Sequence, residues 1–171
     1  METWDAIRAR RATREYDTKP IDRADLERIL EAGRRAPSSR NDQRWHFVLI
    51  QDRDQLEKIS KVWQGAAHIA NAAAAVGLVA PAGDELGVAS SINYDLGQAA
   101  MSMMIAAADL GIGSRTAAVR DHELASEVLG LPDGLQLTWL LGLGYPADRP
   151  LKPIKNPARR PLDEVVHHDR W

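Results

Sequence analysis

The sequence predicts a single α+β domain, because helical and strand-like segments follow one another without the regular strand–helix–strand order of a parallel sheet. The chain has 171 residues, of which 44% are hydrophobic and 27% charged, and this balance is typical of a soluble domain with a sizeable core. The sequence contains no internal repeat, low-complexity linker or cysteine, so neither a domain boundary nor a disulfide is expected. We therefore expect one domain over residues 1–171.

Capping residues and apolar periodicity define the predicted helices. Asp22 and Pro37 enclose a segment whose apolar residues recur at helical spacing, and Asp121 and Gly130 enclose another. A third segment, residues 93–110, is apolar on almost every side, which is typical of a buried helix. The helices are expected at residues 3–12, 22–35, 54–62, 93–110 and 121–129.

Apolar runs bounded by turn residues indicate the strands. Residues 46–51 are apolar on both faces, which predicts a central strand. Residues 76–80 and 135–145 are further strand candidates, and residues 114–119 are expected to be extended after a glycine cap. The tail, residues 147–171, is rich in proline and is predicted to be an extended arm that lies on another surface.

Charge is distributed unevenly along the chain. Residues 1–44 and 149–171 each carry a net positive charge, whereas residues 45–148 are net negative. This pattern indicates either an anion site assembled from both ends of the chain or only the solvation of surface helices. The acidic middle argues against a broad nucleic-acid surface. No metal site, serine hydrolase or Rossmann site is expected from the histidine, serine and glycine spacings.

The first residues are acidic and lack the apolar centre of a signal peptide, and no apolar run approaches the length of a membrane span. The absence of cysteine fits a reducing compartment. We therefore expect a cytoplasmic protein.

Two basic clusters and one polar loop are the candidate functional segments. Arginines at 8, 10, 11 and 14 could grip a phosphate, because guanidinium groups stay charged and present a planar set of donors. A second cluster, Arg159 and Arg160, lies near Lys155, and either cluster alone is more often a solvated surface patch than a phosphate site. Residues 37–43 offer hydroxyl and amide groups, although serine and asparagine also favour a simple helix stop and turn.

Four segments, in this order, resemble those of the flavin-dependent nitroreductase family over almost the whole chain: residues 10–14, 36–45, 143–146 and 159–166. The resemblance implies a central, mostly antiparallel sheet flanked by helices. It also implies a homodimer in which each C-terminal arm is exchanged with the partner subunit, and the alternative is a tail that folds back on its own subunit. The sequence departs from the family pattern at Ala12, where serine is common, and at Arg44, where proline is usual.

The resemblance further implies that FMN is held without a covalent bond at the dimer interface. The ribityl phosphate would be held by the first cluster and by the C-terminal arginines, namely Arg10, Arg11, the backbone at Ala12, Arg159 and Arg160. Arg14, and more loosely His68, would lie near the flavin pyrimidine. The partner subunit would supply Pro37, Ser38, Ser39 and Asn41, and the backbone of Thr116, Ala117 and Ala118 would face flavin N5 and O4.

As a family member, the protein would use NADH or NADPH to reduce nitroaromatics, quinones or a related small acceptor in a ping-pong reaction. Flavin N5 would carry the chemistry, so no catalytic side chain is expected. A cation at Arg14 would stabilise the negative charge of the reduced cofactor. Residues 81–94 are expected to cover the substrate pocket. The alternative is a protein that binds or consumes flavin without turning over nicotinamide.

Overall fold

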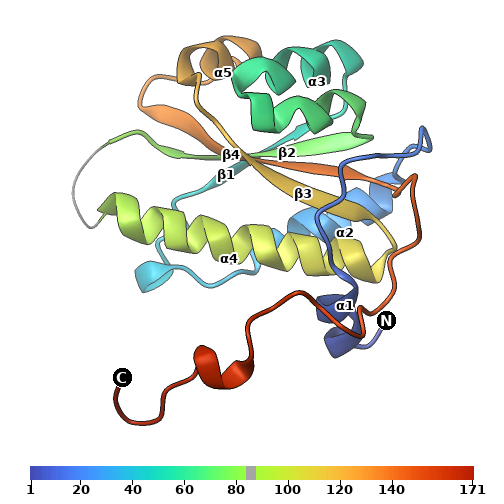
Figure 1. Ribbon diagram of the computed structural model, residues 1–171. Coiled ribbons are helices and arrows are strands. Elements are labelled where there is room, and N and C mark those ends of the chain that lie inside the picture. Colours follow the sequence, from blue (N-terminus) through green and yellow to red (C-terminus); the bar gives the residue numbers. More distant parts are fainter. Residues whose placement is uncertain (84–87) are drawn as a thin grey trace.

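A four-stranded antiparallel sheet lies between two layers of helices in the computed structural model, which describes residues 1–83 and 88–171 (Figure 1). The strand order is β1-β2-β4-β3, and all three pairings are antiparallel. The strands are β1 (His46–Ile50), β2 (Ala74–Pro81), β3 (Gly113–Ala118) and β4 (Leu135–Gly144). The expected α+β class with an antiparallel sheet is therefore confirmed.

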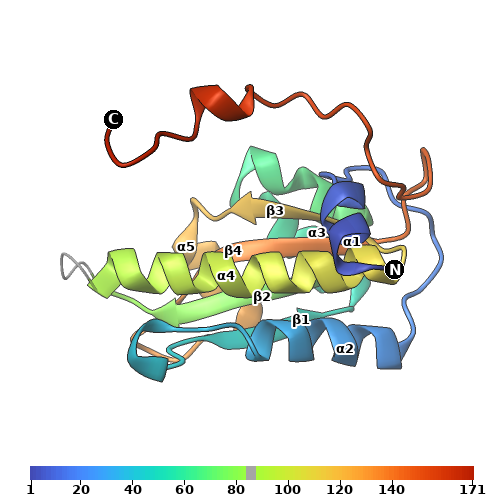
Figure 2. The ribbon, with the colours of Figure 1, turned by 90° about the horizontal axis from the view of Figure 1, so that it is seen from below.

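Different helices cover the two faces of the sheet (Figures 1 and 2). One layer consists of α2 (Arg23–Arg34) and α4 (Val88–Asp109), and α1 (Thr3–Ala9) packs on α4. The other layer consists of α3 (Arg53–Ile59), α5 (His122–Leu129) and the 3₁₀ segments Ser60–Val62 and Gln64–Asn71.

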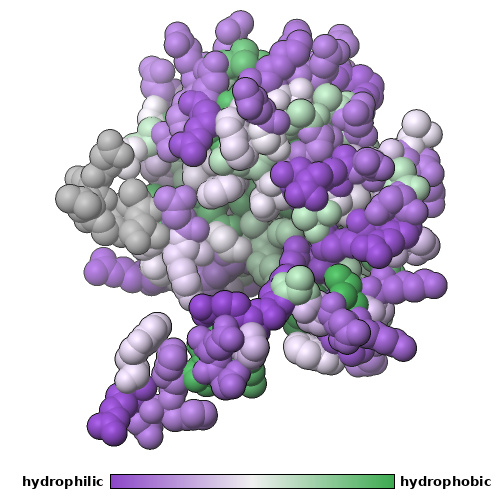
Figure 3. Space-filling view, viewed as in Figure 1, coloured by the Kyte–Doolittle hydropathy of each residue, from purple (hydrophilic) through white to green (hydrophobic). Residues whose placement is uncertain are grey.

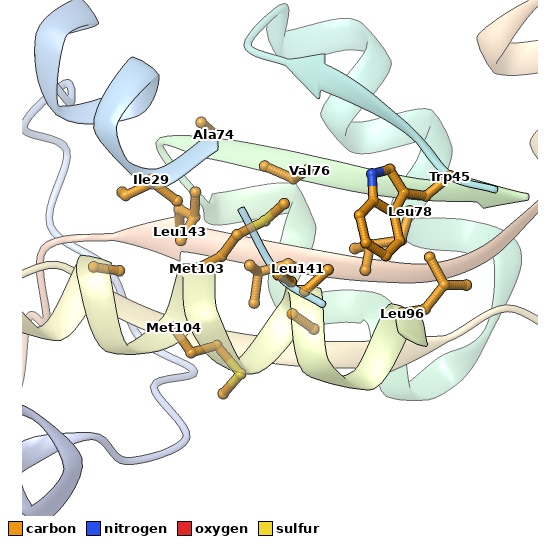
Figure 4. Packing of buried hydrophobic residues seen from close by; sticks show 14 of the residues in the cluster. Ile29, Trp45, Ala74, Val76, Leu78, Leu96, Met103, Met104, Leu141 and Leu143 are labelled. Carbon is orange, nitrogen blue, oxygen red and sulfur yellow. The ribbon is translucent and has the colours of Figure 1, made fainter. Parts of the chain in front are cut away.

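Alternation along β4 divides the core between these layers. Leu141 and Leu143 pack with Met103 of α4 and Ile29 of α2 (Figure 4). Leu140, one position away, belongs to the core under α3 and α5. The sheet therefore has a buried face on each side, as the period of two along a strand requires.

Most predicted helix boundaries agree with the structure, and their caps have the expected geometry. The side chain of Asp121 accepts a hydrogen bond from the Leu124 amide at 2.9 Å, and Gly130 ends α5 in the left-handed region with φ 60°. Gly111 ends α4 with φ 74°.

The first helix is shorter than predicted and ends at Ala9 instead of residue 12. Arg10 adopts an extended backbone, and Ala12 forms a parallel bridge with Ser114 of β3. The basic segment 10–14 is therefore attached to the edge of the sheet and does not continue the helix.

The prediction that residues 46–51 form a central strand is wrong, because β1 is an edge strand. Its two faces are nevertheless both in contact with core, since Phe47 packs against one cluster and Val48 against the other. Coverage of both faces by helices, and not a central position, explains its continuous apolar run.

The long helix differs from expectation in its start and its burial. It begins at Val88, five residues earlier than predicted, and Tyr94 and Met101 are 70% and 38% exposed. One apolar side of α4 thus has no cover among the described residues of this chain. Residues 84–87 of the expected pocket-covering segment lie outside the described residues.

The C-terminal tail first follows the body and then leaves it (Figures 1 and 2). Leu151 is buried against Ala9 and Ala108, and the Ile154 amide donates to the carbonyl of Arg8 at 3.1 Å. Beyond this point four apolar side chains of the arm are exposed: Leu162, Val165, Val166 and Trp171. The extended arm is as predicted, and its exchange with a partner stays a prediction. None of the described helices is long and apolar enough to cross a lipid bilayer.

Candidate functional site

A basic cavity of about 450 Å³ lies between α1 and the C-terminal tail. Both basic clusters contribute to it, since Arg8 and Arg10 line it together with Lys155 and Arg159. Apolar side chains complete its wall, namely Trp4, Ile7, Met101, Ile154 and Pro157. The two ends of the sequence therefore meet at one concave, positively charged surface.

Arg10 is the arginine of this cavity that has a buried, unsatisfied hydrogen-bond donor. Its Nε is buried and has no hydrogen-bond partner among the described residues. Arg8, in contrast, pairs with Asp5 at 2.6 Å, and Arg159 donates to the carbonyl of Ala158 at 2.8 Å. A buried guanidinium nitrogen without a partner is costly, and the same side chain lines the cavity, so Arg10 is the first candidate to bind an anion there.

The other two arginines expected at the phosphate lie differently. Arg11 donates from Nη2 to Asp148 at 2.6 Å and to the carbonyl of Arg149 at 2.8 Å, and this hydrogen bond lowers the pKa of Asp148. Arg160 lies outside the residues that line the basic cavity and donates to the carbonyl of Glu164 at 3.3 Å. The hydrogen bonds of Arg11 thus connect the start of the tail with the segment 10–14.

An apolar cavity of about 490 Å³ adjoins the basic one, and Met101 lines both. It lies between α4 and the β3–β4 edge of the sheet, and its lining residues are Asn93, Leu96, Gly97, Ala100, Met101, Met104, Thr116 and Trp139. In Figure 3, weakly polar and hydrophobic residues gather in the middle of this face and hydrophilic residues surround them. The cavity suits a flat, largely apolar ring.

The backbone of β3 borders the apolar cavity at the open edge of the sheet. The Thr13 amide donates to the carbonyl of Ser114 at 3.1 Å, so the backbone groups of Ser114 point away from β4. Because alternate residues of a strand direct their backbone groups to the same side, those of Thr116 and Ala118 also point away from β4. The side chain of Ala117 is buried in the opposite core. Two of the three predicted positions thus offer outward amide groups.

A second group of cations lies where the segment 10–14 meets β3. Arg14 is exposed, and its positive charge lowers the pKa of Arg115, after the larger effect of burial. No ion pair joins either guanidinium to a carboxylate in the part of the chain that the structure describes. Sequence analysis missed Arg115, because a single arginine in a short strand carries no motif.

His68 is held by backbone and lies on the sheet face opposite α4. Its ring nitrogens are 3.2 Å from the carbonyl of Gly65 and 3.4 Å from the carbonyl of Arg115. Burial lowers the pKa of His68, the two carbonyl contacts oppose this effect, and the positive charges of Arg115 and Arg14 reinforce it. His68 is therefore buried behind β3, and its place near the flavin pyrimidine stays a prediction of the family resemblance.

The loop 37–43 is strained and is held by α4. Arg40, Asn41 and Gln43 have φ values of 54°, 59° and 50°, a region that costs a non-glycine residue roughly 1–2 kcal/mol, less for asparagine. The Ser39 amide lies 3.1 and 3.0 Å from the two carboxylate oxygens of Asp95. The Gln43 amide donates to the Ser38 hydroxyl at 3.0 Å.

The predicted loop residues do not contribute to the cavities described above. Pro37, Ser38, Ser39 and Asn41 line neither the basic nor the apolar cavity of their own chain. Their action on another subunit stays a prediction.

The sequence of the chain is similar to those of known proteins. The family model described as "Nitroreductase family" matches residues 7–90. A putative NADH dehydrogenase/NAD(P)H nitroreductase of Archaeoglobus fulgidus is 33% identical over 96% of both chains. An FMN reductase (NAD(P)H) of Bacillus subtilis is 28% identical over 94% of this chain and 71% of its own.

The fold is also found among solved structures. The crystal structure of a putative NADH oxidase from Clostridium acetobutylicum superposes with a TM-score of 0.86 at 24% identity. That match covers 98% of this chain and 100% of the other.

Proposed function

Because this chain belongs to the nitroreductase family, whose members are oxidoreductases, we propose that it binds FMN non-covalently at a homodimer interface. NADH or NADPH then supplies the electrons for reduction of a small acceptor. The curated relative named as an FMN reductase supports the choice of flavin and of nicotinamide. Nitroaromatics, quinones or a related small molecule are the proposed acceptors, and the relative named as an NAD(P)H nitroreductase supports the first of these.

The observation that carries this proposal is the pair of adjoining cavities. Arg10 lines the basic cavity, and its buried Nε has no hydrogen-bond partner in residues 1–83 and 88–171. Met101 lines both cavities, so the apolar cavity begins where the basic one ends. A molecule with a phosphate at one end and a flat ring at the other fits this arrangement. FMN has that form, so the residues present suit the cofactor.

The residues of the chain bind and orient, and none is required as an acid, base or nucleophile. When bound, FMN supplies the hydride-accepting and hydride-donating centre. Arg10 and Arg159 would neutralise the phosphate, while the outward amides of Thr116 and Ala118 would position the polar edge of the ring. Side chains of α4 and Trp139 would exclude water from the ring.

Purified protein and its absorption spectrum test the proposal. We expect a yellow protein, or a colourless one that becomes yellow with added FMN, whose visible absorption disappears when NADH or NADPH is added without oxygen. A protein that refuses FMN contradicts the proposal. Tight FMN binding without bleaching by either nicotinamide would instead support the alternative of a flavin-binding protein without nicotinamide turnover.

Arg14→Gln is expected to lower the reduction potential of the bound cofactor with little effect on its retention. Loss of the positive charge near the pyrimidine would make the reduced form less stable, by roughly 1.4 kcal/mol, which is about 30 mV for a two-electron couple. Potentiometry with a reference dye measures the shift. The matched control is Arg34→Gln, because Arg34 lies on α2 and pairs with Glu31; an equal shift in both variants would refute the role of Arg14.

A further inference from the structure

Asp95 of α4 is a buried carboxylate that faces the loop 37–43. Its residue is 4% exposed, and both carboxylate oxygens contact the Ser39 amide, at 3.1 and 3.0 Å. The Ser39 hydroxyl lies 3.5 Å from one of them. No ion pair joins Asp95 to a basic side chain within residues 1–83 and 88–171. Burial of a carboxylate is costly, and the hydrogen bonds from the Ser39 amide offset part of that cost.

The loop that Asp95 holds would not keep its shape by local preference. Arg40, Asn41 and Gln43 are in the left-handed region, which non-glycine residues occupy when their surroundings hold them there. Gln98, one helical turn after Asp95, donates from Nε2 to the carbonyl of Pro37 at 3.4 Å. Two side chains of α4 thus fix the start of the loop.

Helix α4 therefore has two roles on two sides. Asn93, Leu96 and Gly97 line the apolar cavity of their own chain. Asp95, between them in sequence, points to a loop that lines neither cavity of that chain. One turn of α4 therefore lines the apolar cavity on one side and holds the loop 37–43 on the other.

We propose that Asp95 is a positioning residue that acts in trans. Its carboxylate holds the loop of its own subunit so that Ser38, Ser39 and Asn41 complete the FMN site to which the other subunit contributes Arg10. This inference rests on the proposed function, because it requires a homodimer that binds FMN.

Mixed dimers separate action in trans from action in cis. Two different affinity tags allow a dimer to be isolated that contains one Asp95→Asn subunit and one Arg10→Ala subunit. If Asp95 acts in trans, one site of this dimer combines the intact Arg10 with the intact loop, and the other site combines both defects. We expect one FMN per dimer to bind with the wild-type dissociation constant, whereas the Asp95→Asn homodimer binds both about tenfold more weakly.

The matched control places both substitutions on one subunit and pairs it with a wild-type subunit. Action in trans then leaves each site with one defect, so no FMN binds with wild-type affinity. Action in cis reverses the two results, giving a tight site in the control and none in the first dimer. That reversal overturns the proposal, as does a tight site in both dimers or in neither.

Two further measurements keep the result interpretable. Thermal unfolding without FMN shows whether Asp95→Asn retains the fold, and Asp95→Glu, which keeps the carboxylate but displaces it by one methylene group, replaces it in the same pairing if it does not. Wild-type protein that fails to bind FMN would refute the proposed function. Wild-type protein that binds FMN, with the reversed pattern in the mixed dimers, would refute the role of Asp95 alone.

Discussion

Arg10→Ala is expected to weaken FMN binding by roughly 2–3 kcal/mol, which raises the dissociation constant about 30- to 150-fold. Arg10 lines the basic cavity, and its Nε is buried without a partner in the described structure. A charge-assisted hydrogen bond to the phosphate would be lost in the variant. Titration of apoprotein into FMN, followed by flavin fluorescence, measures the change.

Two further variants define the specificity of that result. Arg23→Ala removes an arginine whose side chain is 92% exposed on α2 and which pairs with Glu27, so FMN affinity should not change. Arg10→Lys keeps the charge but loses the planar set of donors, so its affinity should be intermediate. If Arg10→Ala retains FMN like the wild type, the phosphate site is assigned wrongly even though the fold is right.

Deletion of residues 161–171 is expected to convert the proposed homodimer to a monomer and to release the proposed FMN. The deleted arm carries Leu162, Val165, Val166 and Trp171, which are 76%, 47%, 42% and 100% exposed on the single chain. Burial of a large apolar side chain stabilises an association by about 1.5–3 kcal/mol, so several such contacts would be lost together. Sedimentation velocity at micromolar concentration measures the change in mass.

The control for this deletion keeps the length of the arm. Replacement of Leu162 and Val165 by serine should weaken the dimer less than the deletion does. Both variants should keep the thermal unfolding of the subunit core, because Leu151 and the contact of Ile154 with α1 remain. A truncated protein that is still a dimer with bound FMN would show that the arm is not exchanged.

Local signals in the sequence predicted the helices well, whereas position within the sheet was not predictable. Asp121 and Gly130 act at the two ends of α5 as expected, because caps depend on neighbouring residues only. The edge position of β1 was missed, because an apolar run reports that both faces are covered and not how many strands lie beside it. The early end of α1 depends on the bridge from Ala12 to Ser114, which is distant in sequence.

In the candidate site, too, the sequence predicted the residue clusters but not the contacts between distant residues. The basic clusters were visible in the sequence, and the structure brings Arg10 and Arg159 to one cavity. The attachment of Arg11 to Asp148 was not visible, since an arginine in a cluster does not reveal its partner. The contact between Asp95 and the loop was not visible, because nothing in the sequence connects Asp95 with Ser39.

The separation of the loop 37–43 from the cavities of its own chain has a consequence for how the enzyme would respond to dilution. If each site needs parts of two chains, cofactor retention and subunit association share one equilibrium, and each strengthens the other by mass action. At low protein concentration the dimer would then dissociate and release its flavin, and added flavin would promote dimerisation of newly made subunits. The amount of polypeptide in the cell would itself set the fraction that is active.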